Sequence, residues 1–227
     1  MCGRFNLTAS GQEIAEALGL DEAPELAPRY NIAPSRPVAV VRLEAATGRR
    51  RLGTVRWGLI PAGAPRTERG HINARAETAW QKPSFREAFA RRRCLVPATG
   101  FYEWQRTHAR RRRPWLFALG SGRPFAFAGL WEPPVGNDAP ATCTILTTEP
   151  NGVTRPVHDR MPVILSPAAY ARWLDPSPGD AVALRLLLAP FPAEAMTARP
   201  VSTVVNDARF DGPACLEPEE EPPLPLG

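Results

Sequence analysis

The chain begins Met1-Cys2-Gly3-Arg4, and a cysteine in second position can become a double nucleophile. An initiator methionine is normally removed when the next residue is small, which would leave Cys2 with a free α-amine beside its thiol. Reference pKa values are about 8 for the amine and about 8.5 for the thiol, so both groups are partly deprotonated near neutral pH. A 1,2-aminothiol condenses with aldehydes to a Schiff base and then a thiazolidine, and it can also attack an acyl group. The alternative is that Cys2 is a frayed terminal residue.

Two further side chains are candidates for proton transfer. Glu103 is flanked by aromatic residues in a predicted strand. It is therefore either a solvent-facing residue or a desolvated carboxyl group, whose raised pKa would suit proton transfer near neutral pH. His158 stands beside Asp159 and Arg160, just before an apolar strand. It is a candidate acid, base or phosphate donor, and the alternative is a surface-loop histidine.

The segment Asn73-Ala74-Arg75-Ala76-Glu77-Thr78 combines four polar chemistries in six residues. An amide, a guanidinium, a carboxylate and a hydroxyl separated by small alanines are typical of an ordered polar site. The sequence lacks the G-x-S-x-G, P-loop and G-x-G-x-x-G motifs, which argues against several common enzyme classes. The four cysteines form no C-x-x-C pair and there are only three histidines, so we expect no metal and no cofactor.

Charge favours a nucleic-acid partner. The net charge is +5, and the segment after Pro213 holds four glutamates and no basic residue, leaving 28 basic against 19 acidic residues before it. All the basic residues except Lys82 are arginines, whose guanidinium groups match phosphate oxygens bidentately. An arginine-biased genome would give the same composition. No apolar run approaches a membrane span and no signal-peptide core is present, so a soluble, cytoplasmic protein is expected.

Many short strands must position these groups. Strands are expected at 3–7, 37–43, 51–59, 100–104, 115–118, 125–131, 141–148, 161–165 and 199–201. Helices are expected after capping boxes at Ser10 and Ser84, and at 166–174 and 181–188. The pattern predicts one α+β domain over residues 1–212, with mostly antiparallel strands in a barrel-like sheet and peripheral helices. The Pro/Glu-rich segment 213–227 is expected to be disordered.

Alternation along 100–104 predicts that Phe101 and Glu103 share one face of the strand, with Tyr102 and Trp104 on the other. Arg106–Arg113 follows as a basic hairpin tip.

Together the motifs resemble the SOS response-associated peptidase (SRAP) family of abasic-site processing proteins that crosslink to DNA. The resemblance covers residues 2–206 and rests on the order of its elements as much as on any one of them. The matching elements are Cys2-Gly3-Arg4-Phe5, Arg29-Tyr30-Asn31-Ile32-Ala33-Pro34, Trp57-Gly58-Leu59-Ile60-Pro61, Asn73-Ala74-Arg75-Ala76-Glu77-Thr78, Arg93-Cys94-Leu95-Val96-Pro97, Gly100-Phe101-Tyr102-Glu103-Trp104, Leu146-Thr147-Thr148 and His158-Asp159-Arg160-Met161-Pro162.

The resemblance implies an activity and roles for individual residues. Cys2, after loss of Met1, would capture the ring-opened aldehyde of an abasic site in single-stranded DNA as a thiazolidine. Asn73 would orient the adduct, Glu103 would shuttle protons and His158 would assist ring opening or closure. The implied DNA contacts are Arg4, Arg75, Arg160, Thr147, Asn31 and Pro34, with the arginines on flanking phosphates. We expect a monomer that associates with the bacterial nucleoid when bound to DNA.

One departure concerns the loop Pro61-Ala62-Gly63-Ala64-Pro65, which has no aromatic residue where family members often carry base-wedging aromatics. Stacking on such residues contributes ~1–3 kcal/mol per base, so the missing aromatics leave open how this protein bends DNA or separates its strands. Three functions are weighed: covalent capture of abasic DNA, in which β-elimination (lyase) chemistry is also available to the Schiff base; an N-terminal cysteine peptidase, as the family name implies; and a non-covalent reader of modified DNA.

Overall fold

Two sheets of short, apolar strands enclose the segment that carries Cys2. The computed structural model describes residues 2–64, 70–106, 112–134, 139–177 and 181–219. The first sheet has five strands in the order β13-β8-β7-β1-β2, and every pairing in it is antiparallel. Its strands are β13 (Met196–Pro200), β8 (Arg112–Leu119), β7 (Gly100–Arg106), β1 (Phe5–Leu7) and β2 (Arg29–Ile32).

The second sheet follows the order β11-β10-β4-β3-β6-β9-β12. Its strands are β11 (Met161–Pro162), β10 (Thr142–Thr148), β4 (Arg50–Trp57), β3 (Pro37–Leu43), β6 (Arg93–Ala98), β9 (Phe125–Glu132) and β12 (Ile164–Leu165), and β5 (Asn73–Arg75) pairs in parallel with β10. Because β10 pairs with both β4 and β9, this sheet is partly ring-like, although it is not a true barrel. The predicted α+β class with mostly antiparallel strands is confirmed.

Short helices cover the outside of the sheets. In α1 (Gly11–Leu18) the predicted capping box of Ser10 and Glu13 is present, and Gly19 ends the helix with a φ of 64°. The capping box predicted at Ser84 is wrong, because α2 (Arg86–Arg91) begins after Phe85 without a side-chain cap. The remaining helices are η1 (Pro167–Ala169), α3 (Tyr170–Leu174), α4 (Ala181–Leu186), η2 (Ala193–Ala195), η3 (Thr203–Asn206) and η4 (Pro213–Leu216).

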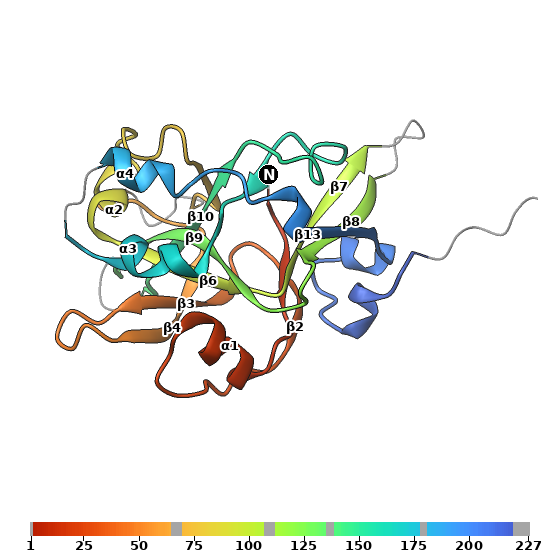
Figure 1. The fold of residues 1–227 in the computed structure, drawn as a ribbon, viewed down its shortest axis with the longest axis horizontal. Coiled ribbons are helices and arrows are strands. Elements are labelled where there is room, and N and C mark those ends of the chain that lie inside the picture. Colours follow the sequence, from red (N-terminus) through yellow and green to blue (C-terminus); the bar gives the residue numbers. More distant parts are fainter. Residues whose placement is uncertain (1, 65–69, 107–111, 135–138, 178–180, 220–227) are drawn as a thin grey trace, which may run out of the picture.

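Figure 1 shows α2, α3 and α4 on one side of the strands and the C-terminal segment, in blue, on the other. Among the residues that the structure describes, no helix is long and apolar enough to cross a membrane.

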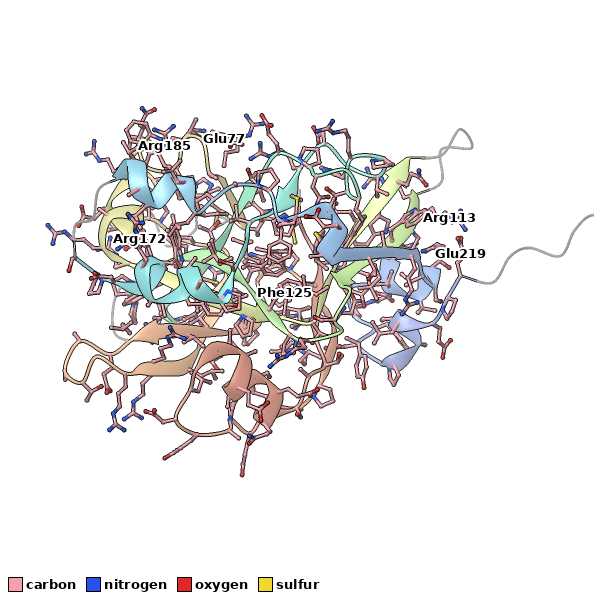
Figure 2. All side chains as sticks on the ribbon, in the orientation of Figure 1. Glu77, Arg113, Phe125, Arg172, Arg185 and Glu219 are labelled. Carbon is pink, nitrogen blue, oxygen red and sulfur yellow. The ribbon has the colours of Figure 1, made fainter. Side chains whose placement is uncertain are left out.

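The interior divides into two apolar clusters, and β7 contributes to both. Phe101 lies in the larger cluster and stacks on Phe117 with ring centroids 5.0 Å apart. Tyr102 lies in the smaller cluster, which also contains Val205 and Cys215 of the C-terminal segment. The predicted alternation is therefore confirmed for these neighbours, and it directs the next residue, Glu103, toward the larger cluster. In Figure 2, side chains fill the space between the sheets, with Phe125 among them.

The strand β1 lies between β2 and β7, in the middle of its sheet. Phe5 pairs with Ile32 on one side and with Phe101 on the other. The residue of β7 opposite Asn6 is Gly100, where a Cβ atom would lie 3.1 Å from Nδ2 of Asn6 in β1 and 2.9 Å from the carbonyl oxygen of Phe117 in β8. This central position ties down the N-terminal end of the described chain.

The C-terminal segment packs onto β2 instead of leaving the domain. The carboxylate of Asp211 accepts hydrogen bonds from the backbone amides of Tyr30 at 2.6 Å and Asn31 at 3.0 Å, and from Arg29 at 2.5 Å. Further on, η4 buries Cys215 completely. The prediction of disorder from Pro213 is therefore wrong for residues 213–219, because Cys215 supplies an apolar anchor. Residues 220–227 lie outside the described part of the chain.

Replacing Asp211 with alanine should destabilise the domain, because two backbone amides and the Arg29 guanidinium lose their acceptor. We expect a loss of about 1–3 kcal/mol in the free energy of unfolding, measured by urea denaturation. The matched control is Asp21→Ala, which removes a carboxylate from an exposed ion pair with Arg49 and should cost less than about 0.5 kcal/mol. Equal losses in the two variants would contradict this account of the segment.

Candidate functional site

Cys2 is fully buried, at 0% exposure, three residues before the start of β1. Its carbonyl oxygen accepts a hydrogen bond of 2.7 Å from the side-chain amide of Asn73. Burial raises the pKa of the Cys2 thiol far above its ordinary value, and the Glu103 carboxylate raises it further. The thiol is therefore held in its protonated form, close to a carboxyl group. The alternative interpretation of Cys2 as a frayed end is wrong.

Asn73 reaches Cys2 because β5 runs parallel to β10, with Asn73 opposite Ile145. The small residue Ala74 is buried beside it. The Oδ1 atom of Asn73 is also buried and has no hydrogen-bond partner among the described residues. A buried acceptor without a partner costs about 1–3 kcal/mol, so this atom is available to a donor that enters the site.

Glu103 is a buried carboxyl group, only 3% exposed, on the inward face of β7. The desolvated interpretation of this residue is correct. Burial raises the pKa of Glu103 to about 7, and the nearby Asp159 carboxylate contributes to the rise. A group with this pKa can both accept and release a proton near neutral pH.

His158 faces Glu103 across a short gap, with its Nε2 atom 3.9 Å from Oε2 of the carboxyl group. Its Nδ1 atom accepts a 3.0 Å hydrogen bond from the backbone amide of Arg160 and lies 3.0 Å from Oδ1 of Asp159. When the ring is neutral, the amide bond therefore puts the proton on Nε2, toward Glu103. When the ring is charged, Nδ1 can instead donate to Asp159.

Arg4 is oriented by groups from distant parts of the chain. Its Nη1 atom donates to Oδ1 of Asn31 at 2.7 Å and to the carbonyl oxygen of Val205 at 2.8 Å, and its guanidinium lies over the Trp104 ring at 5.6 Å. Asn31 is 2% exposed, and its amide nitrogen donates to backbone carbonyl oxygens in 205–210. Asn31 thus positions Arg4 and does not itself line the cavity.

Arg160 is occupied by a carboxylate of its own chain. Its two terminal nitrogens bond both oxygens of Glu77 at 2.7 and 2.8 Å, and Nη2 also donates to the carbonyl oxygen of Thr147 at 2.6 Å. The Thr147 side chain is fully buried, and Arg75, its partner in the β5–β10 register, is exposed. Arg160, Glu77, Thr147 and Arg75 thus form a polar cluster of their own. The sequence did not distinguish this cluster from the group that contains Glu103, His158 and Arg4.

A cavity of about 640 Å³ opens at Gly3, the residue after Cys2, although Cys2 itself does not line it. It is lined by Gly3, Arg4, Pro34, Glu103, Trp104, Arg112, His158 and Asn206. The residue after Pro34, Ser35, adopts a positive φ of 67° and donates its amide to the carbonyl oxygen of Trp57 at 2.8 Å. Across the described ranges, no group of three or more His, Cys, Asp or Glu side chains is placed to hold a metal ion.

Of the residues singled out from sequence, four line this cavity: Arg4, Pro34, Glu103 and His158. Four lining residues were not predicted as site residues: Gly3, Trp104, Arg112 and Asn206. Trp104 belonged to a matched motif and could have been inferred from it. Asn206 is recognisable only in the fold, where its Oδ1 accepts a 2.6 Å bond from the Trp104 indole. The loop without aromatics forms a turn at 61–64, and its last residue, Pro65, lies outside the described residues.

Comparison with known proteins identifies the family. A family model described as SOS response associated peptidase (SRAP) matches residues 1–208. Abasic site processing protein YoqW of Bacillus subtilis (strain 168) is 42% identical over 225 residues, which cover 96% of this chain and 99% of that protein. Abasic site processing protein HMCES of Xenopus tropicalis is 28% identical over 262 residues, 95% of this chain and 78% of that protein.

Solved structures show the same fold. A protein from Bacteroides thetaiotaomicron superposes with a TM-score of 0.82 at 25% identity, over 96% of this chain and 100% of the other. A protein from Bordetella bronchiseptica gives a TM-score of 0.74 at 28% identity, over 88% of this chain and 100% of the other. Because the family model covers most of its length, the chain belongs to the SOS response associated peptidase (SRAP) family, and the predicted resemblance is confirmed.

The buried carboxyl group makes a prediction about stability. The pKa of Glu103 rises from 4.5 to about 7 on folding, so between these values the folded state binds a proton that the unfolded state has released. Wild-type stability should therefore fall as pH rises through this window. Glu103→Gln removes this titration. The free energy of unfolding of the variant minus that of the wild type should therefore be larger at pH 8 than at pH 4, by on the order of a few kcal/mol.

Denaturant unfolding at both pH values measures this difference. The control is Glu149→Gln, at an exposed position at the end of β10. A Glu103→Gln variant that keeps the same difference from wild type at pH 4 and pH 8 would contradict the raised pKa.

Proposed function

We propose that this protein captures abasic sites in single-stranded DNA covalently through Cys2, once Met1 has been removed. One observation carries the proposal: Cys2 is buried next to Gly3, which lines a cavity whose wall also presents a carboxyl group with a pKa of about 7 and a histidine. An abasic site in its open form is an aldehyde flanked by phosphates. The curated relatives are named abasic site processing proteins, in agreement with that substrate.

The chemistry is a condensation in two bond-forming steps. The Cys2 amine adds to the aldehyde carbon, and the resulting carbinolamine loses water to give a Schiff base. The Cys2 sulfur then adds to the imine carbon while its proton passes to the nitrogen, which closes a five-membered thiazolidine. One water molecule is released overall, and no oxidant, metal or cofactor takes part.

Glu103 suits the proton transfers in both steps. Loss of water needs an acid, and sulfur attack needs a base, because burial keeps the Cys2 thiol protonated. A carboxyl group with a pKa of about 7 can serve in each role in turn. The Nε2 atom of His158 lies 3.9 Å from Glu103. His158 can therefore return a proton to Glu103 or take one from it, and exchange that proton with solvent.

Asn73 fits the role of orienting the adduct. It already holds the Cys2 carbonyl oxygen through its amide nitrogen, so the backbone that carries both nucleophiles is fixed. Its buried Oδ1 atom can accept a hydrogen bond from the Cys2 amine or from a hydroxyl group of the sugar. Either bond would offset the desolvation of that oxygen.

The arginines differ in how readily they would bind phosphates. Arg75 is exposed, and Arg4 lines the cavity with one terminal nitrogen bonded to protein oxygens. Arg160 would first have to exchange Glu77 for a phosphate. Such an exchange replaces one charge-assisted bidentate contact with another. The new contact would fix the position of the DNA backbone without reading the base sequence.

A denaturing gel tests the proposal directly. Wild-type protein without Met1, incubated with a single-stranded oligonucleotide that carries one abasic site, should give a band that resists heat and detergent. Cys2→Ala keeps an α-amine but no thiol, so it should give no such band, and borohydride should trap its Schiff base. Protein with an N-terminal extension that blocks the amine should give neither product.

The matched control is Cys215→Ala, since Cys215 is equally buried but belongs to the other apolar cluster. It should crosslink as the wild type does. A wild-type protein that binds the oligonucleotide without a heat-stable adduct would favour the non-covalent reader, and a thiol-dependent cleavage of peptides without any adduct would favour the peptidase.

Glu103→Gln should slow adduct formation while leaving affinity for undamaged single-stranded DNA within about twofold of wild type. General acid–base catalysis contributes about 10²–10⁴-fold in rate, so a loss of at least about 10²-fold is expected. Quenched gels under single-turnover conditions measure the rate. An unchanged rate would show that Glu103 does not catalyse proton transfer in adduct formation.

A further inference from the structure

Trp80, a tryptophan outside the cavity, lies beneath an exposed arginine. Trp80 is half-buried and packs against the larger apolar cluster. The guanidinium carbon of Arg185, in α4, lies over its ring at 4.8 Å from the centroid, within the range of a cation–π interaction. Within the described residues, this guanidinium forms no hydrogen bond or ion pair. The charge of Arg185 is therefore not neutralised by a described carboxylate.

The turn after β5 fixes the position of Trp80. The backbone amide of Ala79 donates to the carbonyl oxygen of Arg75 at 2.8 Å, which bends the chain back after the strand. The indole nitrogen of Trp80 donates to the carbonyl oxygen of Glu77 at 3.1 Å. Because the turn itself satisfies the one polar group of the indole, the ring needs no further hydrogen-bond partner.

A series of contacts joins Trp80 to the wall of the cavity. His158, which lines the cavity, accepts the backbone amide of Arg160 at 3.0 Å. The Arg160 side chain bonds the Glu77 carboxylate at 2.7 and 2.8 Å, and the backbone of Glu77 holds the Trp80 indole. Figure 2 shows Glu77 and Arg185 along the same edge of the molecule. The pair of Trp80 and Arg185 therefore lies beyond the His158 side of the cavity, next to Arg160.

Positive charge surrounds this pair. Burial opposes the change, but hydrogen bonds from Arg160 and the charges of Arg160 and Arg75 lower the pKa of the Glu77 carboxyl. Both guanidinium groups therefore act on the residue that holds the Trp80 indole, and Arg185 adds a third from α4. Proteins bind single strands by combining positive charge along the backbone with aromatic or guanidinium planes against the bases. Trp80 and its neighbouring arginines provide both features.

We propose that Trp80 and Arg185 form a stacking platform for a base of the DNA strand that leaves the cavity past Arg160. The proposal rests on the proposed function for its nucleic-acid partner, but not on the covalent chemistry. The base would stack on the layer that the guanidinium and the indole ring form. Every base has a π-face, so the platform would add affinity without selecting a sequence.

The test compares two fluorescently labelled strands of equal length and charge. One is oligothymidylate, and in the other every nucleoside is replaced by a base-free tetrahydrofuran. Neither strand carries an aldehyde, so neither reacts with Cys2. Anisotropy measures the binding of each strand to the full chain. The ratio of the two dissociation constants gives the preference for bases, because the phosphates are the same in both strands.

Trp80→Leu should reduce the preference for bases at least about fivefold, the lower end of what one stacked base contributes. The loss should come from weaker binding of oligothymidylate, while binding of the base-free strand stays nearly unchanged. Trp80→Phe keeps an aromatic ring and should retain most of the preference. Arg185→Gln should weaken binding of both strands at low salt, because a charge is lost, and should also reduce the preference for bases.

A second pair of tryptophan and arginine supplies matched controls. Arg42, in β3, lies over the ring of the half-buried Trp131 at 4.4 Å. Trp131 pairs with Cys143 near the start of β10, whereas Arg160 bonds Thr147 near the end of that strand. Trp131→Leu and Arg42→Gln should therefore keep the preference for bases within about twofold of wild type. Thermal unfolding of each variant checks that the fold is retained.

The outcomes separate the two proposals. If wild-type protein binds neither strand, the proposed function fails, and the inference fails with it. If it binds, but Trp80→Leu weakens both strands equally, Trp80 has only a structural role and the inference alone is overturned. An equal loss of preference in Trp131→Leu, or in Trp80→Phe, would also overturn it, because the effect would not depend on an aromatic ring at this position.

Discussion

The structure depends on the position of β1 in the middle of its sheet. A three-residue strand at the start of a chain would ordinarily fray, but here both of its edges are paired, by β2 and by β7. This pairing fixes the backbone that leads back to Cys2, and the Asn73 amide fixes the Cys2 carbonyl oxygen from the second sheet. Cys2 is therefore held by both sheets, so its burial follows from the fold as a whole.

The same arrangement explains why Glu103, the carboxyl group close to Cys2, has a raised pKa. The alternation of β7 that buries Phe101 also turns Glu103 inward, where burial disfavours its charged form. The domain accepts this cost, and the result is a carboxyl group that titrates near neutral pH beside a thiol that remains protonated. Titratable groups with pKa values shifted by burial are concentrated at functional sites.

The C-terminal segment completes the other wall of the site. Asn31, in β2, bonds three carbonyl oxygens of that segment and orients Arg4, so contacts more than 170 residues apart in sequence decide where one guanidinium points. The segment also supplies Asn206 to the Trp104 indole. A sequence motif such as Arg29–Pro34 gave no means of telling a residue that contacts a ligand from one that positions its neighbour.

The sequence alone was sufficient for the local features and for the family. Capping of α1, the β3–β4 hairpin and the two faces of β7 follow from short-range chemistry, and the order of the motifs identified the SRAP family. Sequence left open whether Cys2 was frayed and whether Glu103 was desolvated, because burial depends on what packs against a side chain from distant segments. It also missed the anchoring of 213–219 by Cys215 and the pairing of Arg160 with Glu77. Only the tertiary structure decided these points, since each is a contact between residues far apart in the chain.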